Sequence, residues 1–581
     1  MLRSSRPVVS LIRSLVLGTA TTTTATMLLA TTAVVGCQDE SQPEYWVGKL
    51  NDAAWRARAV KRLEQFFEDA VTKNGNDVKA AGVQDVGNKT VEPLTKTYVE
   101  HYDQLDTKTR TMLIKLLASY RDKRTEPALK KAFEEFAKRP ATAKDESDIK
   151  WAARAAGDLK LEGVNGPMVE AFAKMRTSTM LGGVVYRDLN TAMLNISAKS
   201  WTGQLLAKLE PEMTRPKDNK DPSAFDSYRD QQFWQSTAAE VLGRIGDPQA
   251  VEPLLKVLLD PEKLDIHVTA LLALVKIGKP SVDAASQLIQ GKHESLVAFS
   301  KKRIKEITGK DPQGTPYVAT AAAVIGMTGR ADGLPALLAA LNAEKDLQNK
   351  AVIARELTKL PATEDSKAAF KAVFEAMTPE NPGGGALEAL VESVGHFYDP
   401  GMIDWLLGRA AAVKGDADDI KPFQAACALV AMKLAKPDQL PQVKAAVDRY
   451  GSDLEKKLYK LVEQEVKACG DRAACYVSAI QKSENQEQAS QFAGVKDGYM
   501  IAIYGNAQTR DELVAGLDKV TNAAVRFTAA SAIDHLTPKG DKGVSGKLNA
   551  IIQKNADSPD ADKRAGDTPL KQVMYRIDAR G

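Results

Sequence analysis

Few residues in this chain have the types and spacing that chemistry needs, and the clearest of them are cysteines. The chain of 581 residues holds four cysteines. Cys469 and Cys475 flank a Gly470–Asp471 turn between two helical runs, and a helix–turn–helix corner can bring their Cα atoms within bonding range. We therefore predict a Cys469–Cys475 disulfide, with two small buried thiols as the alternative. Cys427 shares an apolar helix face and is predicted to be a core thiol.

The five histidines give no metal site. None forms a ligand pair at i and i+4, and none lies near the cysteine pair to complete four zinc ligands. His396 is the most interesting because Phe397–Tyr398 follows it, although a position at a helix end is enough to explain a histidine. No nucleophile elbow, phosphate-binding loop or dinucleotide fingerprint occurs. We therefore predict no catalytic residues, no metal, no cofactor and a protein that is not an enzyme.

The first 37 residues predict export and a lipid anchor. Three arginines and no acidic residue are followed by a weakly apolar stretch from about Leu15 to Val35, and then by Cys37. Val34–Cys37 resembles a bacterial lipobox, and the resemblance implies cleavage before Cys37 with lipid on its thiol and amine. An uncleaved anchor and an ordinary signal peptide with an incidental cysteine are the alternatives. The polar stretch Gln38–Pro43 follows at once, as a tether should.

Charge argues against nucleic acid as a partner. The formal net charge is +4, and removal of the signal would take away three arginines and no acids, which leaves the chain close to neutral. A near-neutral protein has no general electrostatic attraction to a polyanion. The partners that remain are the membrane, reached through lipid on Cys37, and an envelope protein that the sequence does not identify. The predicted location is the bacterial cell envelope, on its periplasmic face or at the cell surface.

The elements that position these residues are predicted to be paired amphipathic helices. The clearest pair lies between Phe233 and Leu259, where one apolar face reaches Ile245, Gly246–Pro248 ends it, and a second face begins at Val251. Each helix has one apolar face, so a pair must stack on another pair to bury the rest. Turn signals return at roughly 30 to 50 residues, which is the period of two-helix solenoid repeats.

The segment Ala238–Leu255, AAEVLGRIGDPQAVEPLL, resembles a HEAT repeat. Weaker copies lie at Arg121–Leu129 and Ala331–Leu341, and a C-terminal copy lies at Asn522–Leu536. The resemblance implies an all-α fold, a right-handed superhelical solenoid of HEAT-like antiparallel helix pairs. It leaves the function open, because such arrays serve many functions.

Shifts in composition divide the chain into segments. These are a signal peptide at 1–36, a flexible tether at 37–43, N-terminal helical repeats at 44–213, a linker or long loop at 214–230, a HEAT-like repeat array at 231–555 and a C-terminal tail at 556–581. The linker is predicted from the polar, proline-bearing stretch after Thr214, and the loose tail from the charged stretch Ala556–Pro569. No second membrane-spanning helix is expected after the signal.

The combination of a lipid anchor and a solenoid predicts that this chain binds another protein. Superhelical arrays present long concave surfaces that suit an extended protein, so we expect a scaffold or adaptor of the cell envelope that binds another protein along the solenoid surface. The alternative is a carrier or chaperone for an apolar ligand or an unfolded client, which needs an exposed apolar groove. An enzyme like the HEAT-like lyases that attach bilins would need catalytic acids and a ligand pocket, and no matching motif occurs.

Overall fold

The structure of the chain is a computed structural model. It describes residues 39–138, 147–176, 184–213, 215–216, 222–312, 314–379, 385–413, 417–482, 488–520, 522–556 and 567–580. Within these ranges the chain consists of helices and the turns between them, without a β-strand. The prediction of an all-α superhelical solenoid is therefore confirmed. No helix in the same ranges combines the length and the apolar character that crossing a bilayer requires.

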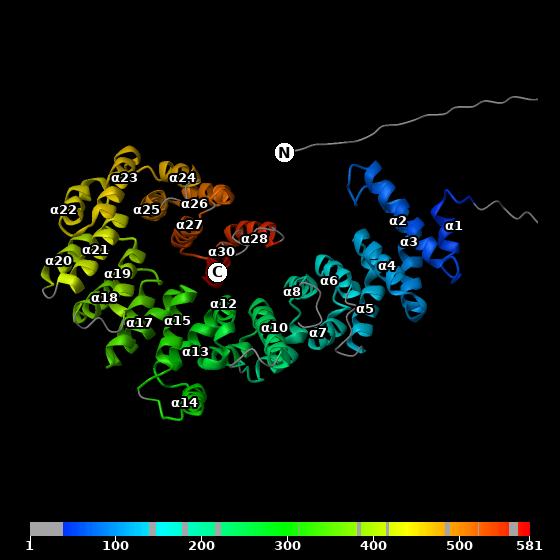
Figure 1. Ribbon diagram of the computed structural model, residues 1–581, viewed down its shortest axis with the longest axis horizontal. Coiled ribbons are helices and arrows are strands. Elements are labelled where there is room, and N and C mark those ends of the chain that lie inside the picture. The colour runs from blue at the N-terminus through cyan, green and yellow to red at the C-terminus, as the bar shows by residue number, and fades with distance from the viewer. Residues whose placement is uncertain are drawn as a thin grey trace, which may run out of the picture.

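Two layers of helices run along the solenoid (Figure 1). The inner, concave layer consists of α2 (Arg56–Lys73), α4 (Thr107–Tyr120), α6 (Ser147–Leu159), α8 (Val184–Ile196), α10 (Pro222–Ile245), α12 (His267–Ile277), α15 (Val318–Thr328), α17 (Leu347–Leu357), α19 (Ala386–Val394), α21 (Ala417–Leu434), α25 (Gln488–Tyr504), α27 (Ala523–His535) and α30 (Thr568–Arg580). The outer layer consists of α3 (Ala81–Glu100), α5 (Glu126–Lys138), α7 (Asn165–Lys174), α9 (Thr202–Leu209), α11 (Val251–Leu259), α13 (Lys279–Ile289), α16 (Leu334–Ala343), α18 (Glu364–Ala376), α20 (Met402–Ala412), α22 (Leu440–Tyr450), α24 (Ala473–Lys482), α26 (Ala507–Gly516) and α28 (Lys542–Ala556).

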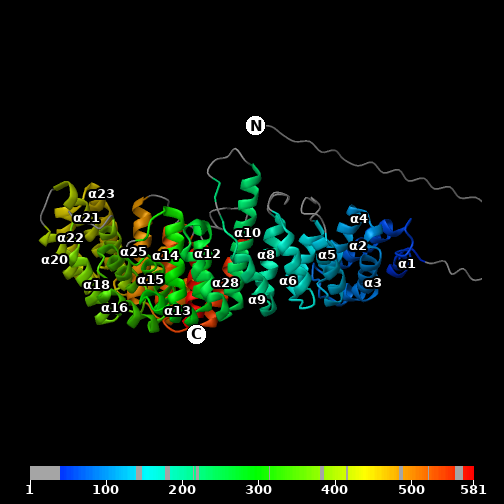
Figure 2. The same ribbon diagram turned by 90° about the horizontal axis from the view of Figure 1, so that it is seen from below.

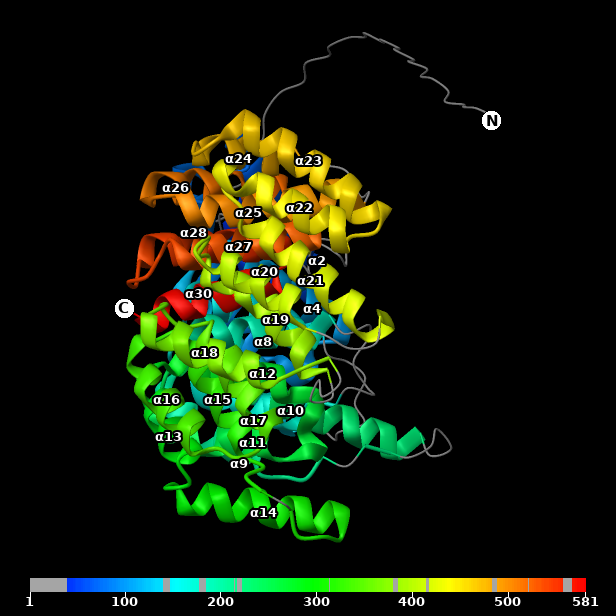
Figure 3. The ribbon, with the colours of Figure 1, turned by 90° about the vertical axis from the view of Figure 1, so that its left-hand side faces the viewer.

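The remaining helices cap or join these layers. α1 (Pro43–Gly48) packs on α2 and α3, and α23 (Asp453–Cys469) packs between α22 and α25. α14 (Glu294–Thr308) stands apart from the rest at one edge of the molecule (Figure 3), where it packs on α11. Short 3-10 helices connect several pairs: η1 (Tyr102–Gln104), η2 (Lys123–Thr125), η4 (Lys199–Trp201), η5 (Pro248–Ala250), η6 (Pro261–Ile266), η7 (Ala331–Gly333), η8 (Gly395–Phe397), η9 (Pro437–Gln439) and η10 (Leu517–Lys519).

Local signals explain where individual helices begin and end. Asp106 begins α4, because its carboxylate accepts a hydrogen bond from the backbone N–H of Thr109 at 2.9 Å. Ser452 and Glu455 form a capping box at the start of α23. Gly329 ends α15 with a φ of +67°, a conformation that favours glycine. Residues that begin or end helices in this way keep the helices short, so that each helix buries one apolar face against its neighbours.

The C-terminal half of the solenoid curls into a closed ring (Figure 1). From α12 onward the inner helices pack one after another until α30, which packs against α27 and then meets α12 and α15 again. We call the part from α12 to α30 the ring and the part from α1 to α10 the arm. Viewed from below, the arm and the ring share one slab, from which the start of α10 projects (Figure 2). Through these contacts α30 joins the two ends of the curl.

The predicted loose tail at 556–581 differs from the structure, because Thr568–Arg580 is the helix α30. Four of its buried apolar side chains lie at helical spacing: Leu570, Val573, Met574 and Ile577. Pro569 sits in the first turn of α30, where a proline is compatible with a helix, so here it marks the start of a helix and not a break. The charged side chains of α30 are also used, since Lys571 pairs with Glu240 and Asp578 pairs with Lys276.

The predicted linker at 214–230 also differs, since α10 already begins at Pro222. Tyr228 and Asp230 are buried, and the Tyr228 hydroxyl donates to the Asp265 carboxylate. These contacts stabilise a helix in a segment whose polar composition predicts a loop. Thr214 and residues 217–221 lie outside the described residues. Since α10 packs on both α8 and α9, the helices before and after this segment form one continuous stack.

Close packing between inner helices depends on glycine at one position in particular. A Cβ atom at Gly243 of α10 would lie 2.6 Å from the Cα of Ala273 in α12. We expect Gly243→Ala to lower the free energy of unfolding by about 1–3 kcal/mol, because overpacking of this size forces the helices apart. In Gly408→Ala, where the added Cβ meets no atom within 4 Å, helix propensity alone should raise stability by up to about 1 kcal/mol. Thermal unfolding measures both variants, and equal shifts of their melting temperatures relative to wild type would show that the packing at Gly243 is loose.

Candidate functional site

The anchor at Cys37 lies outside the described residues, so lipid attachment stays a prediction. The predicted tether at 37–43 is shorter than expected, because α1 begins at Pro43 and the Trp46 indole donates to the carbonyl oxygen of Glu40 at 2.8 Å. α1 lies at the tip of the arm, at the end farthest from the ring (Figure 1). Lipid on Cys37 would therefore hold the molecule by the tip of its arm.

The cysteines at the turn between α23 and α24 are joined in the structure. Cys469 and Cys475 form a disulfide with a Cα–Cα distance of 5.5 Å. The prediction of Cys427 as a core thiol is confirmed: its side chain is buried, and burial raises the pKa of the thiol to about 12. Cys427 is therefore unreactive while the protein is folded.

The disulfide can be tested directly in purified exported protein. We expect peptide mapping without a reducing agent to recover Cys469 and Cys475 in one linked peptide, and Cys427 as a thiol that reacts with iodoacetamide only after unfolding. Because the closed loop is short, Cys469→Ser with Cys475→Ser should lower stability by less than about 3 kcal/mol. Alkylation of Cys469 and Cys475 in the native, unreduced protein would show that the disulfide is not formed.

A cleft on the concave side of the arm is the first candidate binding site. It has a volume of about 830 Å³ and lies between the inner helices of the arm and α28, which contributes Gln553. Arg121, Trp151, Arg154 and Arg187 line it from the arm side. We call this space the arm cleft. It offers polar and apolar surface side by side, so it does not resemble the exposed apolar groove that a chaperone needs.

Trp151 is the aromatic centre of the arm cleft. Its ring is half-buried, with the guanidinium of Arg154 5.4 Å from its centroid. Arg154 also pairs with Asp188 at 2.8 Å, which fixes its side chain along α8. Arg187 is exposed at the cleft and makes no ion pair with a described residue. An aromatic anchor among charges of both signs is typical of a surface that binds protein.

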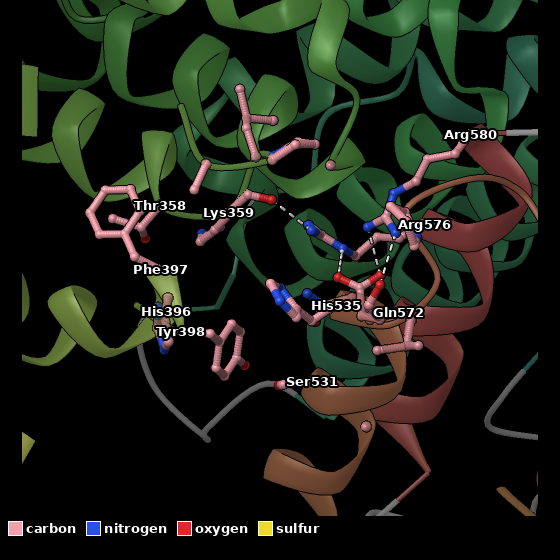
Figure 4. Close-up of a pocket in the computed structure, with 18 of the residues that line it drawn as sticks. Thr358, Lys359, His396, Phe397, Tyr398, Ser531, His535, Gln572, Arg576 and Arg580 are labelled. Carbon is pink, nitrogen blue, oxygen red and sulfur yellow. Dashed lines mark hydrogen bonds and ion pairs between the residues drawn. The ribbon is translucent and has the colours of Figure 1, made fainter. Parts of the chain in front are cut away.

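A second candidate site lies inside the ring (Figure 4). This pocket has a volume of about 340 Å³, and its walls come from the turn after α17, from η8, from α27 and from α30. The side chains that define its chemistry are Lys359, His396, Tyr398, Phe527, Asp534 and Arg576. We call it the ring pocket. It exists only because the ring is closed, since α30 forms one of its walls.

One carboxylate holds the wall made by α30. Asp534 accepts from Arg576 Nε at 2.8 Å and from Arg580 at 2.6 Å. Arg576 also donates to the carbonyl oxygen of Met327, in the last turn of α15, at 2.9 Å, and to that of Lys359, just after α17, at 2.8 Å. Cations at helix C-termini are stabilised by the helix dipole. These bonds join α30 to α27, to α15 and to the turn after α17, and we call the set of Asp534, Arg576 and Arg580 the clasp.

His396, which the sequence singled out, lies in the wall of the ring pocket next to Tyr398. Burial, together with the nearby cations Lys359 and Lys433, lowers the pKa of His396 to about 4. The imidazole is therefore neutral at physiological pH, and it has no hydrogen-bond partner among the described residues. Packing in a pocket wall, and not a helix cap, explains its position.

The arginines and the aspartate of the clasp were missed by sequence reasoning. Arg576 contacts residues that lie 217 to 250 positions away in the chain, and no local pattern reports such a contact. The available signal was the spacing of the apolar residues in α30. Within the described ranges no group of three histidine, cysteine or carboxylate side chains is placed to hold a metal ion.

Comparison with known proteins supports the repeat architecture. The family described as PBS lyase HEAT-like repeat matches residues 234–260, which form the end of α10 and all of α11. The chain therefore contains a HEAT-like repeat where the sequence resemblance is clearest. Among curated proteins, no match to the chain is found.

Solved structures that resemble the chain share little sequence with it. Importin beta is 10% identical over 93% of this chain and 81% of that chain, with a TM-score of 0.25. An engineered protein is 14% identical over 93% and 99%, with a TM-score of 0.18. SYS-1 is 9% identical over 91% and 98%, with a TM-score of 0.21. Scores this low have no further implication for the chain.

Proposed function

We propose that this protein is a non-enzymatic scaffold of the bacterial cell envelope, held by lipid on Cys37, and that it binds another protein in the arm cleft. The observation that supports the proposal most is the arm cleft itself, a concave space of about 830 Å³ with Trp151 among charges of both signs. HEAT-like arrays commonly present such concave surfaces to protein partners. The N-terminal lipobox supplies the reason to expect an anchor.

The shape of the molecule suits this function. A lipid at Cys37 holds the tip of the arm at the membrane, and the ring then stands at the far end of the molecule. The ring braces one side of the arm cleft, because α28 belongs to the ring and lines the cleft through Gln553. A rigid, pre-formed cleft loses little conformational entropy when a partner binds.

The chemistry of the arm cleft points to an extended polypeptide segment as the bound part of the partner. Trp151 offers a place for one apolar side chain. Arg187 offers a cation that makes no ion pair with a described residue, so an acidic side chain of the partner would be stabilised beside it. The cleft has no basic stripe of the kind that binds nucleic acid, since Asp158 and Asp188 lie among its arginines.

The test is crosslinking in intact bacterial cells that express tagged full-length protein, followed by purification and mass spectrometry. Four forms are compared: wild type, Cys37→Ala, Arg187→Glu and Lys130→Glu. Lys130 is the matched control, because it is also an exposed cation but lies on the outer-layer helix α5. We expect one dominant envelope partner with wild type and Lys130→Glu, and its loss with Cys37→Ala and Arg187→Glu.

Two results would contradict the proposal. Equal capture of the partner by wild type and Arg187→Glu would show that the arm cleft is not the binding surface. Unchanged fractionation of Cys37→Ala with membranes would show that Cys37 does not anchor the protein. Lipid on Cys37 is measured separately by intact mass or by metabolic labelling with an alkyne fatty acid.

A further inference from the structure

The ring pocket has the size of a small-molecule site. Its volume of about 340 Å³ lies near the lower end of the range of about 300–1,000 Å³ that is typical of ligand pockets. A dry apolar cavity of about 150 Å³ binds benzene, so a molecule of roughly one or two aromatic rings fits. Five segments that are distant in the sequence meet around this space (Figure 4), and their contacts fix its shape before any ligand arrives.

One side of the ring pocket is aromatic. Tyr398 stands between η8 and α27, with its ring centroid 4.6 Å from that of His535. Phe527 of α27 is 49% exposed, although it lies on an inner-layer helix and lines the pocket. Exposed apolar area costs about 25 cal/mol per Å² in water. A planar apolar ligand that covered Phe527 and stacked near Tyr398 would remove this cost.

The opposite side of the ring pocket carries an excess of positive charge. Lys359, Arg576 and Arg580 line it, while Asp534 is the one acidic side chain among the described residues of its wall. Lys359 donates to both carboxylate oxygens of Glu356, each at 2.7 Å, and Glu356 lies behind the wall. When both carboxylates are counted against the three cations, one positive charge remains, and a ligand with one negative charge would balance it.

His396 adds a neutral polar group between these two sides. Its imidazole is half-buried, lines the ring pocket and has no hydrogen-bond partner among the described residues. In the neutral form one ring nitrogen donates and the other accepts. A ligand oxygen would therefore find a donor there without adding a further charge to the wall. The few polar groups that point into an otherwise apolar pocket are those that orient a ligand.

We infer that the ring pocket binds a small aromatic carboxylate, a planar molecule of one or two rings with a single acidic group. The rings would pack against Phe527 and Tyr398, and the carboxylate would face the side lined by Lys359 and Arg576. This site is independent of the proposed protein partner, which binds in the arm cleft. It would give the envelope protein a second ligand of low molecular weight.

The test is isothermal titration calorimetry of the purified full chain with three naphthalene probes of similar size. The probes are 1-naphthoate, which is an anion, 1-naphthalenemethanol, which is neutral, and 1-naphthylmethylammonium, which is a cation. We expect 1-naphthoate to bind with a stoichiometry of one, about tenfold more tightly than the alcohol, because it gains a charge-assisted interaction. The ammonium probe should bind most weakly. Absence of binding by 1-naphthoate, or equal affinity for all three probes, would overturn the inference.

Two variants place the bound probe in the ring pocket. Gln572→Glu adds one negative charge to the wall with little change of shape. It should therefore weaken the binding of 1-naphthoate about tenfold and leave the binding of the alcohol unchanged. Ser531→Trp fills the space and should weaken the binding of both probes. Leu461→Ser is the control, because Leu461 is 39% exposed on the distant helix α23. Circular dichroism and melting temperature establish that each variant is folded, and unchanged probe binding by folded Gln572→Glu and Ser531→Trp would place the probe elsewhere and overturn the inference.

Discussion

Asp534→Ala is expected to release α30 from the ring and to lower the local free energy of opening there by about 3–5 kcal/mol. The reason is that two buried cations share this carboxylate: the side chains of Arg576 and Arg580 are 7% and 9% exposed, and Asp534 is 15% exposed. Removal of one member of a buried ion pair leaves an uncompensated charge in a poorly solvated site. Here one substitution leaves two such charges.

Hydrogen exchange measured by mass spectrometry resolves this effect by segment. Peptides from α30 and α27 should exchange at least about 100-fold faster in Asp534→Ala, because each 1.4 kcal/mol corresponds to a factor of ten. Peptides from α4 in the arm should not change, since each repeat of a solenoid contacts mainly its neighbours.

Asp518→Ala is the matched control for this experiment. Asp518 pairs with Lys554 at 2.7 Å, but these side chains are 38% and 70% exposed, so the loss should be less than about 1 kcal/mol. Equal exchange in α30 for wild type, Asp534→Ala and Asp518→Ala would show that the clasp does not hold the ring closed.

The second large expected effect is a dependence of the folded protein's stability on pH, and it arises at His396. Burial and nearby cations lower the pKa of His396 from 6.5 to about 4 in the folded protein. Between these two values the unfolded chain binds more protons than the folded chain, so stability falls as the pH falls from about 6.5 to about 4. The corresponding loss is about 3 kcal/mol, and it is absent above about pH 7.5.

The variant His396→Gln isolates this contribution. Glutamine keeps a polar side chain of similar size but does not titrate, so all other groups contribute equally to both proteins. We expect the difference in unfolding midpoint between wild type and His396→Gln, followed in urea from pH 8 to pH 4, to change in favour of the variant as the pH falls. A difference that stays constant over this range would mean that His396 has the same pKa in the folded and unfolded chains.

Periodicity predicted most of the fold correctly. The helix pair around residues 233–259, the all-α class and the solenoid arrangement follow from apolar faces at helical spacing and from turn residues between them. The same rules would have identified α30, because its apolar stripe from Leu570 to Ile577 is as regular as the others. The charged composition before α30 predicts a loose tail, but composition is a weaker signal than the spacing of apolar residues.

The candidate sites were less accessible to sequence reasoning. His396 and Tyr398 were recognisable as an unusual pair, but the residues that complete their pocket lie on α27 and α30. Which helix of an array meets which other helix over hundreds of residues depends on small rotations that accumulate from repeat to repeat. The sequence of a single repeat does not report their sum, so ring closure, the clasp and the ring pocket had to come from the structure.

Zero-length crosslinking is the most direct test of the closed ring, on which the ring pocket and the brace of the arm cleft both depend. A carbodiimide joins amines to carboxylates that are already in contact, and the ion pairs Lys571–Glu240 and Lys276–Asp578 connect α30 to α10 and α12. After digestion and mass spectrometry we expect both linked peptides, together with Lys554–Asp518 as a positive control. A mixture of ¹⁵N-labelled and unlabelled protein distinguishes links within one chain from links between chains. Recovery of Lys554–Asp518 without either α30 link would show that the ring is open and would contradict the account.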